Sequence, residues 1–140
     1  MGIEENKALA RRQWEAMGSG NLDLMAQGYD DNVVYHGGAG DERQGKAAAM
    51  ELANMYRNAF PDVRISIEDM IAEGDRVLTR VRPQGTNTGP LFGMPPTGKK
   101  IDLEWVMNIV RIANGKIVEE WEIFNQMDLM QQLGVIPPNG

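Results

Sequence analysis

The sequence predicts one α+β domain over residues 1–140, with helices first and an antiparallel sheet after them. Three observations support this fold class. The length of 140 residues suits a single domain. Apolar residues recur at helical spacing before residue 60, and strand-like segments follow from residue 63 onward. No Pro/Ser/Gly-rich linker divides the chain, and no segment repeats.

The first half contains three predicted helices and one short strand. A helix over 4–17 carries apolar residues at helical spacing and ends at Gly18-Ser-Gly20. A helix over 22–27 follows Asn21, a plausible N-cap. The β-branched and aromatic segment 33–35 predicts a strand that runs into the glycine-rich loop 37–40. The third helix covers 46–59 and ends before Pro61.

The second half reads as a meander of strands. Strands are predicted over 63–71 and 76–83, joined by the turn 72–75. A turn-rich loop extends to Gly98 and leads into a hairpin with strands over 102–110 and 117–124, followed by a short helix. We expect the sheet to curve strongly around the helices as an open cone with a pocket inside.

Alternation along the hairpin strands separates two faces, because neighbouring side chains on a strand point to opposite sides. One face is bulky and mostly apolar: Leu103, Trp105, Met107, Ile109, Ile117, Glu119, Trp121 and Ile123. The other concentrates polar groups: Asp102, Glu104, Val106, Asn108, Val110, Val118, Glu120, Glu122 and Phe124. This second face is either a solvated outer surface or the wall of a polar-lined pocket.

Composition bounds the class of function. A formal net charge of -6, with no Lys/Arg cluster longer than a pair, argues against nucleic acid as a partner. No apolar run approaches the roughly 18 residues of a membrane span. The charged start of the chain has no apolar signal-peptide stretch, so we expect a cytoplasmic protein. With no cysteine and one histidine, we expect no metal site and no cofactor.

Several motifs resemble a known family. In chain order they are Glu5–Lys7 with Arg11 and Arg12, Gly20–Asp23, Val34–His36, Ala59–Arg64, Gly85–Gly89, Phe92–Gly98, Gly115–Glu119, Trp121 and Gln131–Gly134. Together they are similar to the SnoaL-like polyketide cyclases, or ester cyclase-like proteins, of the NTF2-like superfamily of cone-shaped α+β barrels. The resemblance covers nearly the whole chain. Its most specific parts are the Gly-Met-Pro-Pro-Thr loop and the tail from Gly115 to Gly134.

The resemblance implies a catalytic pair. In the cyclases of this family an aspartate on the last strand is the acid/base, and a histidine on the preceding strand lines the same cavity. Counted from the shared Gly-Lys-Ile, these positions fall on Glu122 and Asn108. A single carboxyl in an apolar pocket can take a proton next to a carbonyl and return it, because burial raises its pKa toward neutrality. Asn108 offers an amide that could orient substrate or stabilise an enolate oxygen.

We expect further residues to bind the substrate around this pair: Trp14, Val34, His36, Tyr56, Arg80, Glu104, Val106, Glu120 and Phe124. His36 would lie near the cavity mouth, as a proton relay or as a structural residue. A buried Arg80 would need a carboxylate partner, for which Glu104 or Glu122 could serve.

The hairpin turn at 113–116 leaves two registers open. A type I turn with a G1 bulge at Gly115 would pair Ile112 with Lys116 and place Asn108 opposite Glu120, with Val106 opposite Glu122. A two-residue type I′ turn would shift the register by one and separate these pairs.

Three functions remain open from the sequence. The first is a cyclase or isomerase with Glu122 as acid/base. The second is water addition to an epoxide, with Glu104, Arg80 and Glu122 as two carboxylates bridged by an arginine. The third is a non-catalytic dimeric protein that binds an apolar metabolite. In each case we expect a small apolar or polyketide-like ligand and a homodimer through the face of Trp105 and Trp121, because that face is too apolar to remain in water.

Overall fold

A curved sheet wraps around the N-terminal helices in the computed structural model, which describes residues 2–38 and 40–137. The helices are α1 (Ile3–Ser19), α2 (Leu22–Gln27), α3 (Lys46–Ala59) and α4 (Gln126–Leu133). The strands are β1 (Tyr29–Gly37), β2 (Glu42–Gln44), β3 (Arg64–Glu73), β4 (Arg76–Thr86), β5 (Lys100–Asp102), β6 (Val106–Ala113) and β7 (Lys116–Ile123). The predicted order of helices and strands is confirmed, with β2 and β5 as additional short strands.

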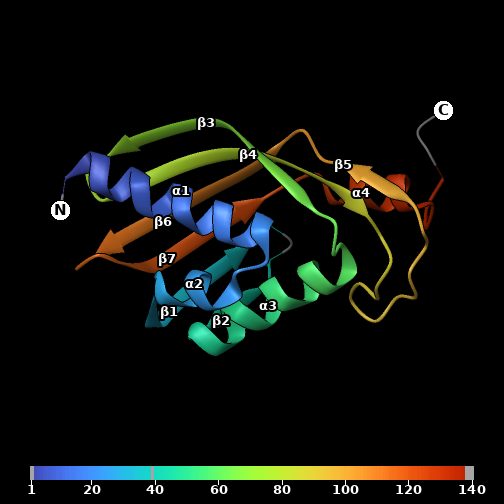
Figure 1. The fold of residues 1–140 in the computed structure, drawn as a ribbon, viewed down its shortest axis with the longest axis horizontal. Helices are drawn as coiled ribbons and strands as arrows, with labels where there is room; N and C mark the ends of the chain where they lie inside the picture. The colour runs from blue at the N-terminus through green and yellow to red at the C-terminus, as the bar shows by residue number, and fades with distance from the viewer. Residues whose placement is uncertain (1, 39, 138–140) are drawn as a thin grey trace.

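The sheet has the strand order β2-β1-β7-β6-β4-β3, and β5 pairs with β4 outside this path. Strands β1 and β7 run parallel, while the other pairs are antiparallel. Figure 1 shows α1 lying across the concave side of the sheet, with α2 and α3 beside it. The α+β class with a curved, unclosed sheet around N-terminal helices is therefore confirmed.

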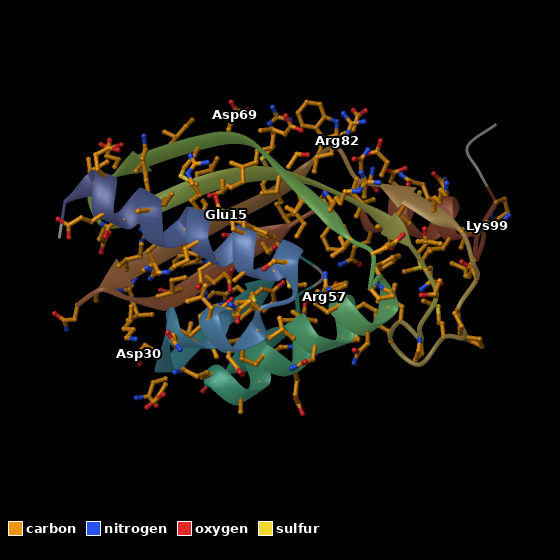
Figure 2. The ribbon with its side chains drawn as sticks, in the orientation of Figure 1. Glu15, Asp30, Arg57, Asp69, Arg82 and Lys99 are labelled. Carbon is orange, nitrogen blue, oxygen red and sulfur yellow. The ribbon has the colours of Figure 1, made fainter. Side chains whose placement is uncertain are left out.

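The helices pack on the sheet through faces of small and aliphatic residues. On α1, Leu9, Ala10 and Met17 are buried, and the helix ends at Gly20, whose positive φ of 79° suits glycine. Arg57 of α3 donates hydrogen bonds to the carbonyl oxygens of Gly18 (3.3 Å) and Pro61 (3.2 Å). Figure 2 shows Arg57 between the end of α1 and α3. This contact fixes the two helices that close one side of the interior.

The β6–β7 hairpin forms the second of the two predicted turns. Asn114 and Gly115 both have positive φ, 52° and 76°, and Ala113 pairs with Lys116, so the turn has two residues and is of type I′. The predicted G1 bulge at Gly115, with Asn108 opposite Glu120 and Val106 opposite Glu122, is wrong.

A bulge farther along β7 restores the alignment of the polar side chains. Ile112 pairs with Ile117 but Arg111 pairs with Glu119, which leaves Val118 as an extra residue. Asn108 consequently lies opposite Glu122, and Val110 lies opposite Glu120. The bulge also moves Ile117 to the inner face, where it is 1% exposed.

The predicted continuous strand over 102–110 is interrupted. Residues 103–105 belong to no strand, and the Leu103 amide donates to the carbonyl of Pro83 at 3.0 Å. Alternation therefore restarts at Val106. Leu103 is buried, whereas Trp105 is 60% exposed, so the predicted shared face of Leu103 and Trp105 is wrong.

Among residues 2–38 and 40–137, none of the helices combines the length and apolar character that crossing a membrane requires.

Candidate functional site

A cavity of about 130 Å³ lies between the concave face of the sheet and the helices α1 and α3. Most of its wall is aliphatic or aromatic, with contributions from α1, α3, β1, β6, β7 and α4. Its polar side chains are few: Gln13, Trp14, Tyr29, Tyr35, Tyr56, Asn108, Glu120 and Glu122. Convergent polar groups in a mostly apolar cavity are typical of a ligand site. The described lining includes no Lys, Arg or His.

Glu120 is the more deeply buried of the two carboxyls, with 8% of its surface exposed. Tyr29 Oη donates to its Oε1 at 2.7 Å, and Asn108 Nδ2 donates to its Oε2 at 2.8 Å. Burial raises the pKa of Glu120, while the two hydrogen bonds act in the opposite direction. Both oxygens of Glu120 are therefore held by protein donors.

Glu122 lies two residues along the same strand and has a looser environment. Tyr35 Oη donates to its Oε2 at 3.0 Å, but Oε1 has only a long contact of 3.5 Å with Asn108 Nδ2. Burial first, and then the charge of Glu120, raise the pKa of Glu122 to about 7. A carboxyl with this pKa and one weakly held oxygen can both accept and return a proton near neutral pH.

Neighbouring strands bring these groups together. Asn108 on β6 pairs directly with Glu122 on β7, and Tyr35 on β1 pairs with Glu120. The side chain of Asn108 is 2% exposed, and its nitrogen contacts both carboxyls, Glu120 and Glu122. The Asn108 amide therefore donates to the protein's own carboxyls, and this geometry fits a residue that holds Glu120 and Glu122 in position.

Seven of the predicted site residues line the cavity: Trp14, Tyr56, Val106, Asn108, Glu120, Glu122 and Phe124. The polar face of the hairpin thus forms a pocket wall at Asn108, Glu120 and Glu122. Four predicted residues do not line it: Val34, His36, Arg80 and Glu104. Their expected place in the cavity wall is wrong.

Val34 and His36 lie on the outer side of β1, because they alternate with the buried Val33 and Tyr35. The His36 ring stacks on Trp121 with centroids 5.4 Å apart. Its Nε2 lies 2.7 Å from Glu119 Oε2. His36 is therefore part of an outer-face cluster and not of the cavity mouth.

Arg80 and Glu104 also lie outside the cavity. Arg80 Nε donates to Asp69 Oδ2 at 2.8 Å, and its guanidinium lies over the Trp105 ring, 5.0 Å from the centroid. Glu104 contacts Arg82 at 3.6 Å. Figure 2 shows Asp69 and Arg82 at the β3–β4 edge of the sheet, away from α2 and α3. The expected pairing of Arg80 with Glu104 or Glu122 is wrong, so the arginine-bridged carboxylate set does not form.

Sequence reasoning missed Tyr29 and Tyr35, which donate to the two carboxyls. Tyr35 alternates with Val33 in a predicted strand, so it could have been assigned to the same face as Val33. Tyr29 follows a short helix directly, and no local pattern marks it as the start of a strand. Its role depends on the parallel pairing of β1 with β7.

Comparisons with known proteins agree with this fold. The family model of the SnoaL-like polyketide cyclases matches residues 8–133. No curated protein matches the chain.

Among solved structures, the candidate hydroxylase AclR from Streptomyces galilaeus is 27% identical, with a TM-score of 0.88 over 99% of this chain and 87% of that one. The candidate polyketide cyclase IdmH from Streptomyces antibioticus is also 27% identical, with a TM-score of 0.79 over 92% of this chain and 98% of that one.

An LEH-like epoxide hydrolase from M. tuberculosis is 17% identical, with a TM-score of 0.75 over 95% of this chain and 92% of that one, and shares the fold alone. Since the family model spans most of the chain, the protein belongs to the SnoaL-like polyketide cyclase family.

Proposed function

We propose that the protein is a cofactor-independent enzyme of the cyclase or isomerase type, in which Glu122 moves a proton at the carbon next to a carbonyl group. The observation that carries this proposal is the pair of neighbouring carboxyls in an apolar cavity, one held on both oxygens and the other, Glu122, only loosely held on Oε1. Membership in the SnoaL-like family supports the same class of chemistry.

The proton balance needs no further reactant. The Glu122 carboxylate takes a proton from the α-carbon, and the C–H electron pair forms the C=C bond of an enolate while the carbonyl π pair moves to oxygen. The carboxylic acid of Glu122 then returns the proton. If the substrate also has a C=C bond conjugated with the enolate, return of the proton to the far carbon of that bond completes an isomerisation. If the enolate carbon first attacks a second carbonyl, the proton goes to the new alkoxide and a ring is closed.

The protein should exchange the α-hydrogens of a small ring ketone for deuterium. An engineered cavity of ~150 Å³ holds benzene, and the cavity of about 130 Å³ is close to that size, so we choose a six-membered ring ketone, cyclohexanone, as the probe. We expect exchange of cyclohexanone in D₂O, followed by NMR, to exceed that in acetate buffer of equal carboxylate concentration. The carboxylate is the active form of the base, so kcat/KM should fall as the pH drops below about 7, the pKa of Glu122.

A flat pH profile would remove Glu122 from the role of base. Exchange no faster than in acetate would contradict the proposed activity and favour the non-catalytic pocket protein.

We also propose that the outer face of the sheet forms a homodimer. Cross-strand pairing aligns a row of side chains across five strands, in the order Ile71, Leu78, Ile109, Trp121 and His36. Beside this row, Trp105 is 60% exposed and Ile123 is 59% exposed. Four of the five side chains in this row are apolar, and together with Trp105 and Ile123 they form an exposed surface that favours a self-complementary contact with a second copy.

Trp105→Glu should therefore convert a dimer into a monomer. Each copy then carries one new negative charge at the symmetric contact, and the two charges repel each other. Sedimentation at micromolar concentration measures this. Ile3→Glu is a matched control, since Ile3 is also an exposed apolar residue, at 42%, but lies at the start of α1. A wild-type monomer, or equal effects of the two variants, would contradict this interface.

A further inference from the structure

The hydrogen-bond donors around the two carboxyls are already in use. Tyr29 Oη donates to Glu120, and Tyr35 Oη donates to Glu122. The nitrogen of Asn108 is directed at both carboxyls. A phenol has one hydrogen, so neither tyrosine has a second one for a ligand while both carboxyls are ionised. Of the two amide hydrogens of Asn108, one is donated to Glu120 at 2.8 Å and the other is directed at Glu122 at 3.5 Å. An enolate oxygen in the cavity would need another donor.

Tyr56 of α3 supplies a free hydroxyl in the same cavity. Its ring lines the cavity wall opposite the sheet. Tyr56 is half-buried, and among the residues that the structure describes no side-chain hydrogen bond involves its Oη. Its Oη is also absent from the fully buried polar atoms that have no hydrogen-bond partner. The hydroxyl is therefore open to a ligand.

The charge of Glu122 acts on Tyr56, and the Phe92 ring restrains it. Burial, and next the negative charge of Glu122, raise the pKa of Tyr56 well above its ordinary value. The phenol consequently keeps its proton near neutral pH, and it lies within the electrostatic influence of Glu122. The Phe92 ring packs edge-on against the Tyr56 ring, with centroids 5.9 Å apart at 90°, which restrains the phenol.

Gln13 and Trp14 are competing donors, and the amide nitrogen of Gln13 already donates one of its two hydrogens to the carbonyl of Met25 at 2.9 Å. The Trp14 indole also lines the cavity, and an indole N–H can only donate. Tyr56 differs from Trp14 in that the edge-on Phe92 ring restrains its side chain, and the Trp14→Phe variant below tests the alternative donor.

We propose that Tyr56 is a catalytic residue that donates a hydrogen bond from its hydroxyl to the carbonyl oxygen of the substrate, while Glu122 acts on the adjacent C–H. This inference rests on the proposed function. As the C–H bond breaks, negative charge grows on the oxygen, and the Tyr56 O–H bond stays intact and stabilises that charge. The substrate would then lie across the cavity, with its oxygen toward α3 and its acidic C–H toward β7.

Tyr56→Phe tests this donor, because it removes the hydroxyl and keeps the ring. We expect kcat for the α-exchange of cyclohexanone to fall roughly 10²-fold, with a much smaller change in KM, since the bond strengthens in the transition state. Phenol, a planar ring with the oxygen placed as in an enol, should bind the variant roughly five- to tenfold more weakly. Benzene, which fills the same space without an oxygen, should bind both proteins within about twofold.

The outcomes separate the donor from the reaction. If the wild type exchanges hydrogen and Tyr56→Phe does so at the wild-type rate, the Tyr56 role is overturned and the proposed function stands. The same holds if Trp14→Phe causes the loss of kcat in its place. If the wild type shows no exchange, the proposed function fails and the catalytic role of Tyr56 fails with it. The ligand comparison then reports separately on the hydrogen bond, and equal changes in phenol and benzene affinity would overturn that contact as well.

Discussion

Glu122→Gln should lower the turnover of a true substrate, and the α-exchange of cyclohexanone, by a factor of about 10² or more. The amide keeps the shape of the side chain and can still accept the hydrogen bond that Tyr35 donates at 3.0 Å. It cannot take up a proton at neutral pH, so the C–H step loses its base. The affinity for phenol should change little, because the cavity keeps its shape. Exchange rates and phenol titrations of the same preparation measure both effects.

Glu120→Gln is the matched control on the same strand. Its negative charge helps to raise the pKa of Glu122, so its neutral replacement should lower the pH at which activity is lost. At pH 8, where Glu122 is ionised in either protein, the loss of turnover should be much smaller than for Glu122→Gln. A larger loss from Glu120→Gln than from Glu122→Gln would exchange the roles of the two carboxyls.

The fold could be predicted because its signals are local. Helix α1 has apolar residues at helical spacing and ends at glycines, and α3 ends before Pro61. Predicted and observed bounds differ by only a few residues for most elements. The departures occur where the chain leaves a regular pleat, at residues 103–105 and at Val118. One unpaired residue moves every later side chain of the strand to the opposite face of the sheet, and a single sequence gives no local sign of such a residue.

The site could be predicted only where it depends on one hairpin. Asn108, Glu120 and Glu122 were found because they share the β6–β7 hairpin and the family motif surrounds them. Arg80 was misplaced because a lone arginine on a strand can face either side, and its partner Asp69 comes from the neighbouring strand β3. Tyr29 was missed because its contact with Glu120 spans 91 residues of sequence. Pairings over that distance depend on the topology of the sheet.

The loop after β4 depends on a glycine at residue 89, and its replacement should have the largest effect on stability. The segment 87–89 packs onto the end of α3, where the amides of Thr88 and Gly89 donate to the carbonyl of Ala59 at 3.1 and 3.3 Å. The buried Asn87 side chain joins them, since its Nδ2 donates to the carbonyl of Gly89 at 2.8 Å. The Thr88 and Gly89 amides thus satisfy the carbonyl of Ala59, which lies at the end of α3 and has no partner within the helix.

Gly89→Ala should cost about 3 kcal/mol of unfolding free energy and lower Tm by roughly 10 °C. A Cβ at this position would lie 2.1 Å from the backbone oxygen of Asn58, and backbone cannot move aside as a flexible side chain can. The loop or the end of α3 must shift, and the hydrogen bonds to Ala59 weaken. Gly18→Ala is the matched control, because Gly18 lies within α1 and its Cβ would meet nothing closer than 3.8 Å. That variant should be neutral or stabilise the protein by up to ~1 kcal/mol, since alanine favours a helix. Denaturant unfolding of both variants measures whether each substitution lowers or raises the free energy of unfolding. If the Gly89→Ala protein lies within about 0.5 kcal/mol of the wild type, the loop does not depend on this close approach.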